Sequence, residues 1–191
     1  MGVYSTIELN EYVMKHLSLL SIPILTIMMT LFGCNNNPKP PIAIVPKIEL
    51  EKFMGSWYVI ANIPTFIEKG AHNAVESYRL APDGSIATTF TFRQDSFNGV
   101  EKSYHPTGFV EDKASNAVWD MQFIWPFKSD YRIVYINDDY SETVIGRNQR
   151  DYVWIMARKP EIPNANYQNI LELLSRQGYD VGLIQKVPQR W

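Results

Sequence analysis

The chain has 191 residues, of which 46% are hydrophobic and 20% charged, and its formal net charge at pH 7 is −2. Binding to nucleic acid calls for a basic patch or stripe, so this near-neutral balance excludes that class of partner. The single cysteine rules out a disulfide within the chain, and the length suits one domain with a hydrophobic core.

An apolar stretch near the beginning of the chain has the features of a signal peptide. Residues 17–32 carry no charged side chain and include Pro23. The stretch is shorter than the roughly 20 apolar residues that a membrane-spanning helix needs. Its length is typical of the apolar region of a secretory signal peptide. We therefore predict a signal peptide over residues 1–33.

The start of this signal peptide has two candidates, Met1 and Met14. Lys15 supplies the positive charge that usually precedes the apolar region. Glu8 and Glu11 fit badly in such a basic segment. These two acidic residues favour Met14 as the true start.

The only cysteine follows the apolar stretch directly, in the sequence LFGC of residues 31–34. These four residues resemble the lipobox of bacterial lipoproteins. That resemblance implies cleavage before Cys34 and acylation of Cys34, so that the protein is anchored to a membrane by lipid. The alternative is a buried free cysteine at the end of a core helix, but the polar, proline-rich residues 35–46 do not favour a helix there. Asn35 takes the position of the usual inner-membrane retention aspartate, which implies the outer membrane.

The mature chain is expected to divide into a tether and a domain. Residues 34–48 are rich in asparagine and proline at their start, so we predict a solvated, partly extended, lipidated tether. Residues 49–191 form the predicted domain. The sequence does not decide whether the protein forms a homodimer with a second copy of the chain.

Apolar and polar residues alternate through most of this domain, with turn residues between the alternating stretches. This pattern predicts many short strands. The expected strands cover residues 55–63, 73–80, 85–93, one stretch between 99 and 110, 116–125, 131–136, 142–147 and 151–158. The period then changes to that of an amphipathic helix over 162–178, followed by a last short strand over 181–187.

Eight strands and one late helix predict an all-β fold. The prediction is an eight-stranded antiparallel up-and-down β-barrel with one C-terminal α-helix, since closure removes the edge strands that invite aggregation. A barrel of this size encloses packed side chains or one small ligand. A sandwich of two sheets is the competing fold, because periodicity alone does not separate the two.

Three motifs in order resemble those of the lipocalin family. Gly55-Ser56-Trp57 resembles its G-x-W motif, Asn137 to Tyr140 falls at the position of its turn between strands six and seven, and Arg158 ends the strand that carries its conserved arginine. The resemblance covers about residues 53–187 and is greatest to the bacterial outer-membrane lipoprotein lipocalins. It implies that Gly55, Trp57, Tyr140 and Arg158 close one end of the barrel.

An apolar stripe on the strand over 116–125 is the candidate ligand wall. Trp119, Met121, Phe123 and Trp125 alternate with Asp120 and Gln122, so these two groups lie on opposite faces of the strand. We expect Trp119, Met121 and Phe123 to face the interior and the polar pair to face water. Similar positions on other strands complete the candidate ligand-binding set: Phe90, Phe92, Trp119, Met121, Phe123, Tyr131, Ile133 and Trp154. Such residues are both core and ligand wall in a barrel of this size.

Catalytic and metal-binding motifs are missing from the sequence. His72 and His105 are far apart, and neither belongs to a pattern with metal-ligand spacing. We therefore expect no catalytic residue, metal or cofactor. The resemblance implies a carrier that holds a fatty acid or lysophospholipid at the outer membrane. An enzyme acting on a hydrophobic substrate and a structural envelope protein with a filled barrel are the alternatives.

Overall fold

The computed structural model describes residues 39–191. The predicted signal peptide, its two candidate starts and Cys34 lie outside the described residues. No helix among residues 39–191 is long and apolar enough to cross a membrane.

Ten strands and three helical segments make up the described part of the chain. The strands are β1 (Gly55–Ile63), β2 (Ala71–Leu80), β3 (Ile86–Gln94), β4 (Glu101–Tyr104), β5 (Thr107–Val110), β6 (Val118–Ile124), β7 (Phe127–Ile136), β8 (Glu142–Gly146), β9 (Val153–Ala157) and β10 (Gln185–Lys186). The helical segments are α2 (Leu50–Phe53), α3 (Asn164–Arg176) and the 3₁₀ turn η1 (Val181–Leu183).

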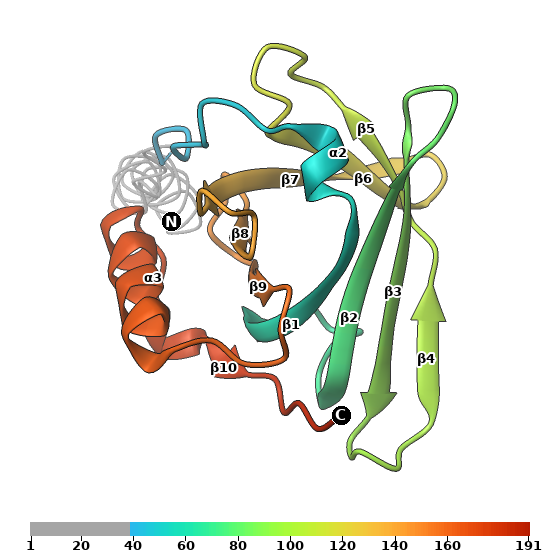
Figure 1. The fold of residues 1–191 in the computed structure, drawn as a ribbon, viewed down its shortest axis with the longest axis vertical. Coiled ribbons are helices and arrows are strands. Elements are labelled where there is room, and N and C mark those ends of the chain that lie inside the picture. Colours follow the sequence, from blue (N-terminus) through green and yellow to red (C-terminus); the bar gives the residue numbers. More distant parts are fainter. Residues whose placement is uncertain (1–38) are drawn as a thin grey trace, which may run out of the picture. The chain divides into compact units, whose positions relative to one another are not determined.

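The sheet closes on itself, which makes the fold a barrel rather than a sandwich. Each strand from β1 to β9 is antiparallel to its neighbours, and β1 also pairs with β9. Strands β4 and β5 both pair with β3 and are separated only by residues 105–106, so they count as one interrupted strand. The predicted eight-stranded barrel with a C-terminal helix is therefore confirmed (Figure 1).

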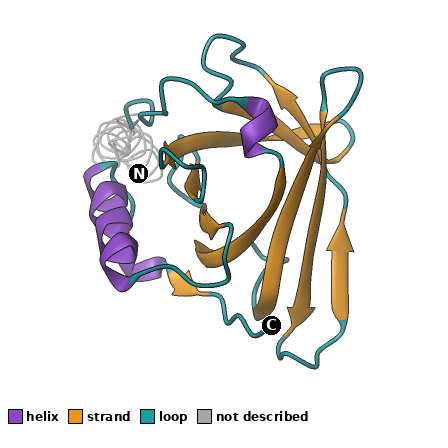
Figure 2. Ribbon diagram, viewed as in Figure 1, coloured by secondary structure: helices purple, strands orange, loops and turns teal. Residues whose placement is uncertain are grey.

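A bulge in β1 divides the apolar residues of that strand between two cores. The register shifts between Val59 and Ala61, so Val59 belongs to the cluster inside the barrel and Ala61 to a second cluster outside it. The outer cluster holds the buried face of α3, with Ile170 and Leu174, and lies against strands such as β9. Figure 2 shows α3 as the long helix beside the strands of the barrel.

Several expected strands differ from those observed. Strand β7 begins at Phe127 and not at residue 131, and the strand expected between residues 99 and 110 is divided into β4 and β5. The stretch 181–187 is not one strand, because η1 takes its first half and leaves only the two-residue β10 on the edge of β1. Strand β6 ends at Ile124, and the chain turns at Trp125. The expected alternation does not reach Trp125, which lies in this turn with its side chain 81% exposed. Alternation holds only while the backbone stays extended.

The predicted tether is also too long at its C-terminal end. Ile42 and Ile48 are buried, and the Val45 and Ile48 amides donate hydrogen bonds to the carbonyls of Ile133 and Ser115. The described residues from 39 onward form one compact unit. The domain therefore begins before residue 49, because apolar residues in this segment complete the core.

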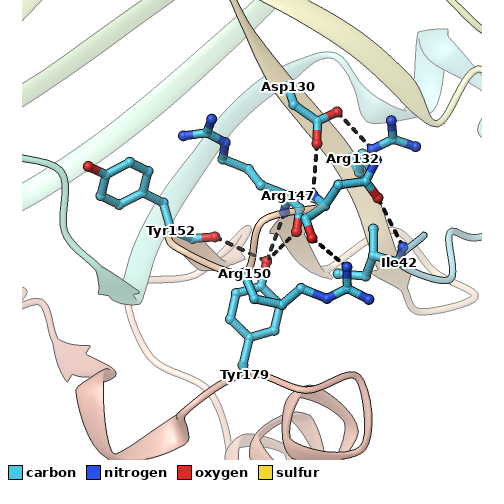
Figure 3. Close-up of polar contacts among 8 residues, drawn as sticks. Ile42, Asp130, Arg132, Arg147, Arg150, Tyr152 and Tyr179 are labelled. Carbon is cyan, nitrogen blue, oxygen red and sulfur yellow. Dashed lines mark hydrogen bonds and ion pairs between the residues drawn. The ribbon is translucent and has the colours of Figure 1, made fainter. Parts of the chain in front are cut away.

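A polar junction fixes this segment to the barrel. The Ile42 amide donates to Asn148 Oδ1 at 3.0 Å, and the Asn148 amide donates to Asp130 Oδ2 at 2.8 Å. Asp130 is also paired with Arg132 at 2.7 Å. Tyr179, which follows α3, accepts a hydrogen bond from the Arg147 amide at 2.8 Å. Figure 3 shows how these contacts join the N-terminal segment, β7, the β8–β9 loop and the residues after α3.

Candidate functional site

The barrel has two different ends. At one end, here called the floor, β1 begins at Gly55 and β9 finishes at Ala157. At the other end, here called the mouth, lie the β1–β2, β3–β4, β6–β7 and β8–β9 connections. This division follows from the antiparallel order of the strands.

The floor is covered by one arginine. The Arg158 guanidinium lies over the Trp57 ring at 3.7 Å and donates hydrogen bonds to the carbonyls of Lys52, Phe53, Met54 and Ser56 at 2.8–3.0 Å. Three of these carbonyls belong to the end of α2, where a cation is favourable. Partial burial lowers the pKa of Arg158 to about 10, so it stays charged at neutral pH.

Gly55 and Tyr140 lie beside this arginine. Gly55 has φ +94, and a Cβ there would lie 3.3 Å from Arg158 Nη1, so the position demands a residue without a side chain. The Tyr140 carbonyl accepts from Arg158 Nε at 3.3 Å, and the Tyr140 hydroxyl accepts from the Glu49 amide at 3.0 Å. The structure thus brings together all four residues that the sequence assigned to barrel closure.

Above the floor lies a layer of buried aromatic rings. The Trp119 and Tyr131 rings stack at 5.2 Å with an interplanar angle of 9°. Phe53 contacts both Trp57 and Trp119 at ring-centroid distances of 5.2 and 5.4 Å. Trp119 and Tyr131, which were expected to contact ligand, are therefore deep in the barrel, next to its closure.

The middle of the barrel is mostly apolar and tightly packed. Phe90, Phe92 and Met121 are 1–4% exposed, and the Phe90 and Phe92 rings are 5.3 Å apart. Ile133, which is fully buried, lies nearer the floor, two residues after Tyr131 on β7. A Cβ at Gly108 would lie 3.0 Å from Met121 Sδ, so the glycine provides the space that Met121 occupies. A ligand in this region has to displace these side chains, and methionine adapts easily to such changes.

The two remaining predicted ligand residues are nearer the mouth. Phe123 is 47% exposed and lies outside the inner core, because the register of β6 shifts after Met121. Trp154 is partly buried against the inner core, and its Nε1 donates to both carboxylate oxygens of Glu68, at 3.1 and 3.2 Å. Seven of the eight predicted ligand residues thus belong to the inner core or pack against it, and they span its depth, whereas Phe123 does not.

Glu68 is a buried carboxylate in the β1–β2 loop. It accepts hydrogen bonds from the Thr65 amide at 3.1 Å and from Asn62 Nδ2 at 3.3 Å, in addition to those from Trp154. Burial raises the pKa of Glu68, and these hydrogen bonds partly oppose that shift. Glu68 therefore places an acidic group inside the mouth.

Glu76 is a second buried carboxyl, on the inward face of β2 between the positions of Trp57 and Phe90 in the neighbouring strands. Burial, and then the charge of Glu68, raises the pKa of Glu76 to about 8. The Tyr78 hydroxyl bonds to Glu76 and lies 2.7 Å from the Tyr131 hydroxyl. At neutral pH, Glu76 is protonated and ends a chain of hydroxyl groups.

Neither carboxyl belongs to an ion pair within residues 39–191. The interior therefore carries acidic groups without a cation beside them. Sequence reasoning missed both residues. A signal for Glu76 was available in the sequence. Alternation places Glu76 on the same face of its strand as Ala74 and Tyr78, whereas Ser77 and Arg79 lie on the other face.

A surface pocket of about 320 Å³ lies outside the barrel, between β10 and the start of α3. Its lining includes Ile60, Tyr167 and Lys186. Ile60 and Tyr167 belong to the outer cluster and Val187, which also lines the pocket, to the inner one. Within the described residues, no three side chains of histidine, cysteine, aspartate or glutamate are grouped to hold a metal ion.

The comparisons with known proteins agree with this architecture. Residues 48–189 match the family of lipocalin-like domains. Temperature-induced lipocalin-1 of Arabidopsis thaliana is 29% identical over 79% of this chain and 84% of its own length. Outer membrane lipoprotein Blc of Citrobacter freundii is 27% identical over 81% and 88%. Insecticyanin of the tobacco hornworm Manduca sexta shares the fold, with a TM-score of 0.63 at 14% identity over 78% and 84%.

The barrel, its closure and this match define the class of protein. The chain belongs to the lipocalin-like family, and its similarity to a bacterial outer-membrane lipoprotein of that family extends over most of its length. The family resemblance predicted from three short motifs is therefore confirmed.

Proposed function

We propose that this protein is a carrier of single-chain lipids, held at the outer membrane by an acylated Cys34. The observation that carries the proposal is a closed barrel whose inward middle is lined by apolar side chains, among them Phe90, Phe92 and Met121. Sites for small apolar ligands are concave and mostly apolar, with a few polar groups that set orientation. The family match supports a carrier of a hydrophobic ligand.

The two buried carboxyls indicate which way the lipid enters. A carboxylate head group that entered first would lose its hydration beside Glu76, without a cation to pair with. The acyl chain therefore enters first, and the head group stays at the mouth. Glu68 lies there, so a zwitterionic lysophospholipid fits better than the anion of a fatty acid.

The proposed location rests on the sequence LFGC, which lies outside the described residues. The relative from Citrobacter freundii is named an outer membrane lipoprotein, which supports the same location. Acyl chains on one cysteine supply the two or more hydrophobic anchors that stable attachment to a bilayer needs.

A carrier is favoured over an enzyme because the interior chemistry is that of a binding site. Ser103 Oγ and His105 Nε2 are 3.2 Å apart, but this serine–histidine contact is exposed to solvent and is separate from the interior residues. The carboxyls inside the barrel contact tyrosine, tryptophan, asparagine and backbone groups. These contacts hold a proton in place and activate no nucleophile.

Native mass spectrometry of the delipidated full chain, titrated with lysophosphatidylethanolamine and with a fatty acid of equal chain length, tests the proposal. We expect a one-to-one adduct with the lysophospholipid at lower concentration than with the fatty acid. Conversion of the added lipid would instead show an enzyme. The absence of any adduct would show that Phe90, Phe92 and Met121 fill the barrel permanently.

A further inference from the structure

Exposed apolar side chains are concentrated at the mouth of the barrel. Eight large hydrophobic side chains in residues 39–191 are more than 45% exposed. Six of them are in mouth connections or at the strand ends beside them: Phe66, Val100, Phe123, Ile124, Trp125 and Phe127. Four of these six belong to the tip of the β6–β7 hairpin, here defined as residues 123–127.

The charges of the two ends differ as well. The mouth connections carry equal numbers of acidic and basic residues, namely Glu68, Asp95 and Asp151 against Lys69, Arg147 and Arg150. The floor turns after β2, β5 and β7 carry Asp83, Glu111, Asp112, Asp138 and Asp139 against Lys113. The segment that covers the floor adds Glu49 and Glu51 against Lys47, Lys52 and Arg158, so acidic residues are still in excess. An anionic surface would therefore repel the floor and not the mouth.

The hairpin tip is convex and not a groove. Ile124 pairs with Phe127 across the turn, after a register shift that follows Met121, and Ile124, Trp125 and Phe127 are 72–81% exposed. In the view of Figure 1 the β6–β7 hairpin extends past the edge of β3. Exposed apolar patches mark protein or membrane contacts, and a convex aromatic tip needs a matching pocket in a protein, whereas a bilayer interface accepts tryptophan and phenylalanine without one.

We propose that the tip of the β6–β7 hairpin inserts into the interfacial region of a phospholipid bilayer and turns the mouth of the barrel toward the lipid. Phe123, the first residue of the tip, lies two positions beyond Met121 on β6, and Met121 belongs to the inner core. A lipid chain that leaves the bilayer at the tip therefore has a short path to the apolar interior. This contact goes beyond anchoring by Cys34 and does not depend on it.

A fluorescent probe at the tip tests the contact. Cys34→Ala removes the only cysteine of the full chain, so that Ile124→Cys supplies a single thiol for labelling. Trp125 and Phe127 stay in place in this variant. The label is nitrobenzoxadiazole, and the vesicles contain phosphatidylethanolamine and phosphatidylglycerol. We expect the emission to shift to the blue on adding vesicles and to lose most of its intensity when the vesicles carry a nitroxide lipid. The same label at Asp83→Cys, in a floor turn, should keep its aqueous emission.

This readout reports where the probe lies, so binding of the apolar residues 17–32 to the vesicle does not imitate it. Adding Trp125→Ser and Phe127→Ser should abolish the shift at residue 124, whereas Leu183→Ser and Trp191→Ser, which remove exposed apolar residues elsewhere, should leave it. Aqueous emission at residue 124 in the presence of vesicles would overturn the proposal. A blue shift that appears without vesicles when the protein concentration is raised would also overturn the proposal, in favour of contact with a second copy of the chain.

Discussion

Glu76→Gln is the substitution that tests the interior of the barrel most directly. The pKa of Glu76 rises from 4.5 to about 8 on folding, so the folded chain keeps a proton that the unfolded chain releases. The contribution of this proton to stability is complete below the unfolded pKa of 4.5. It is lost as the pH rises through the folded pKa of about 8.

The size of the effect follows from the shift. Each pKa unit corresponds to about 1.4 kcal/mol, so a change from 4.5 to about 8 makes the folded chain up to about 5 kcal/mol less stable at pH 8.5 than at pH 4. Glutamine has nearly the same shape and does not ionise, and its amide oxygen can accept the hydrogen bond of Tyr78. Glu76→Gln should therefore remove most of this pH dependence.

Urea unfolding at pH 5 and at pH 8.5, followed by tryptophan fluorescence, measures the difference. With slopes of about 1–3 kcal/mol per M, the variant should unfold at least about 1 M higher than the parent at pH 8.5 and near the parent at pH 5. Glu51→Gln, which changes an exposed carboxylate on α2, should retain the parent's pH dependence. If Glu76→Gln retains it as well, Glu76 is not a neutral buried acid.

Two further predictions concern the ligand wall and the anchor. Met121→Trp should weaken lysophospholipid binding because it fills the apolar middle, at a cost of about 1–3 kcal/mol in stability, whereas Gln122→Trp on the outer face should bind normally. Isothermal titration measures binding by both variants, and circular dichroism checks that they are folded. The assignment of the ligand wall is wrong if both variants bind like the parent. Cys34→Ala should leave an uncleaved precursor that incorporates no labelled palmitate in cells, and equal labelling of the variant would contradict the lipobox interpretation.

The barrel itself could be predicted because its signals are local. In β1 the predicted and observed bounds agree at Gly55–Ile63, since a positive φ at Gly55 starts the strand and alternation holds as far as the bulge after Val59. The closing pair of β1 and β9 is not local, and the sequence left a sandwich open for that reason. The motifs at Trp57 and Arg158 supplied the missing long-range information, because they are useful only when the two strands meet.

Burial in segments without regular structure could not be predicted in the same way. Ile42 and Ile48 lie among prolines, where no period indicates a face, and only the finished barrel provides the surface that covers them. The face of Trp125 was predicted wrongly for a local reason, because alternation was extended one residue into a turn. Only for Ile42 and Ile48 do the determining contacts lie far away in the sequence.

Glu68 and Glu76 were missed because glutamate side chains are almost always exposed to solvent, so their residue type gave no reason to expect them in the interior. Burial is tolerated here because the acids have partners: Glu68 accepts from Trp154, Asn62 and Thr65, and Glu76 keeps its proton beside Tyr78. None of these partnerships is visible before the strands are in register. The missed residues are those that distinguish this interior from a purely apolar one.

The neutral state of Glu76 also bears on the direction of lipid entry. Two charges about 5 Å apart in a partly polar interior repel by about 3 kcal/mol, so an ionised Glu76 would strongly oppose a head group with a negative charge. Protonation removes that repulsion but leaves the loss of hydration, which no nearby cation offsets. At the floor, the Arg158 guanidinium already donates its hydrogen bonds to backbone carbonyls, so a head group gains little there. Each methylene of an acyl chain, in contrast, gains about 0.8 kcal/mol by leaving water. The same interior therefore accepts the tail and leaves the head group at the mouth, where the exposed hairpin tip would meet the bilayer.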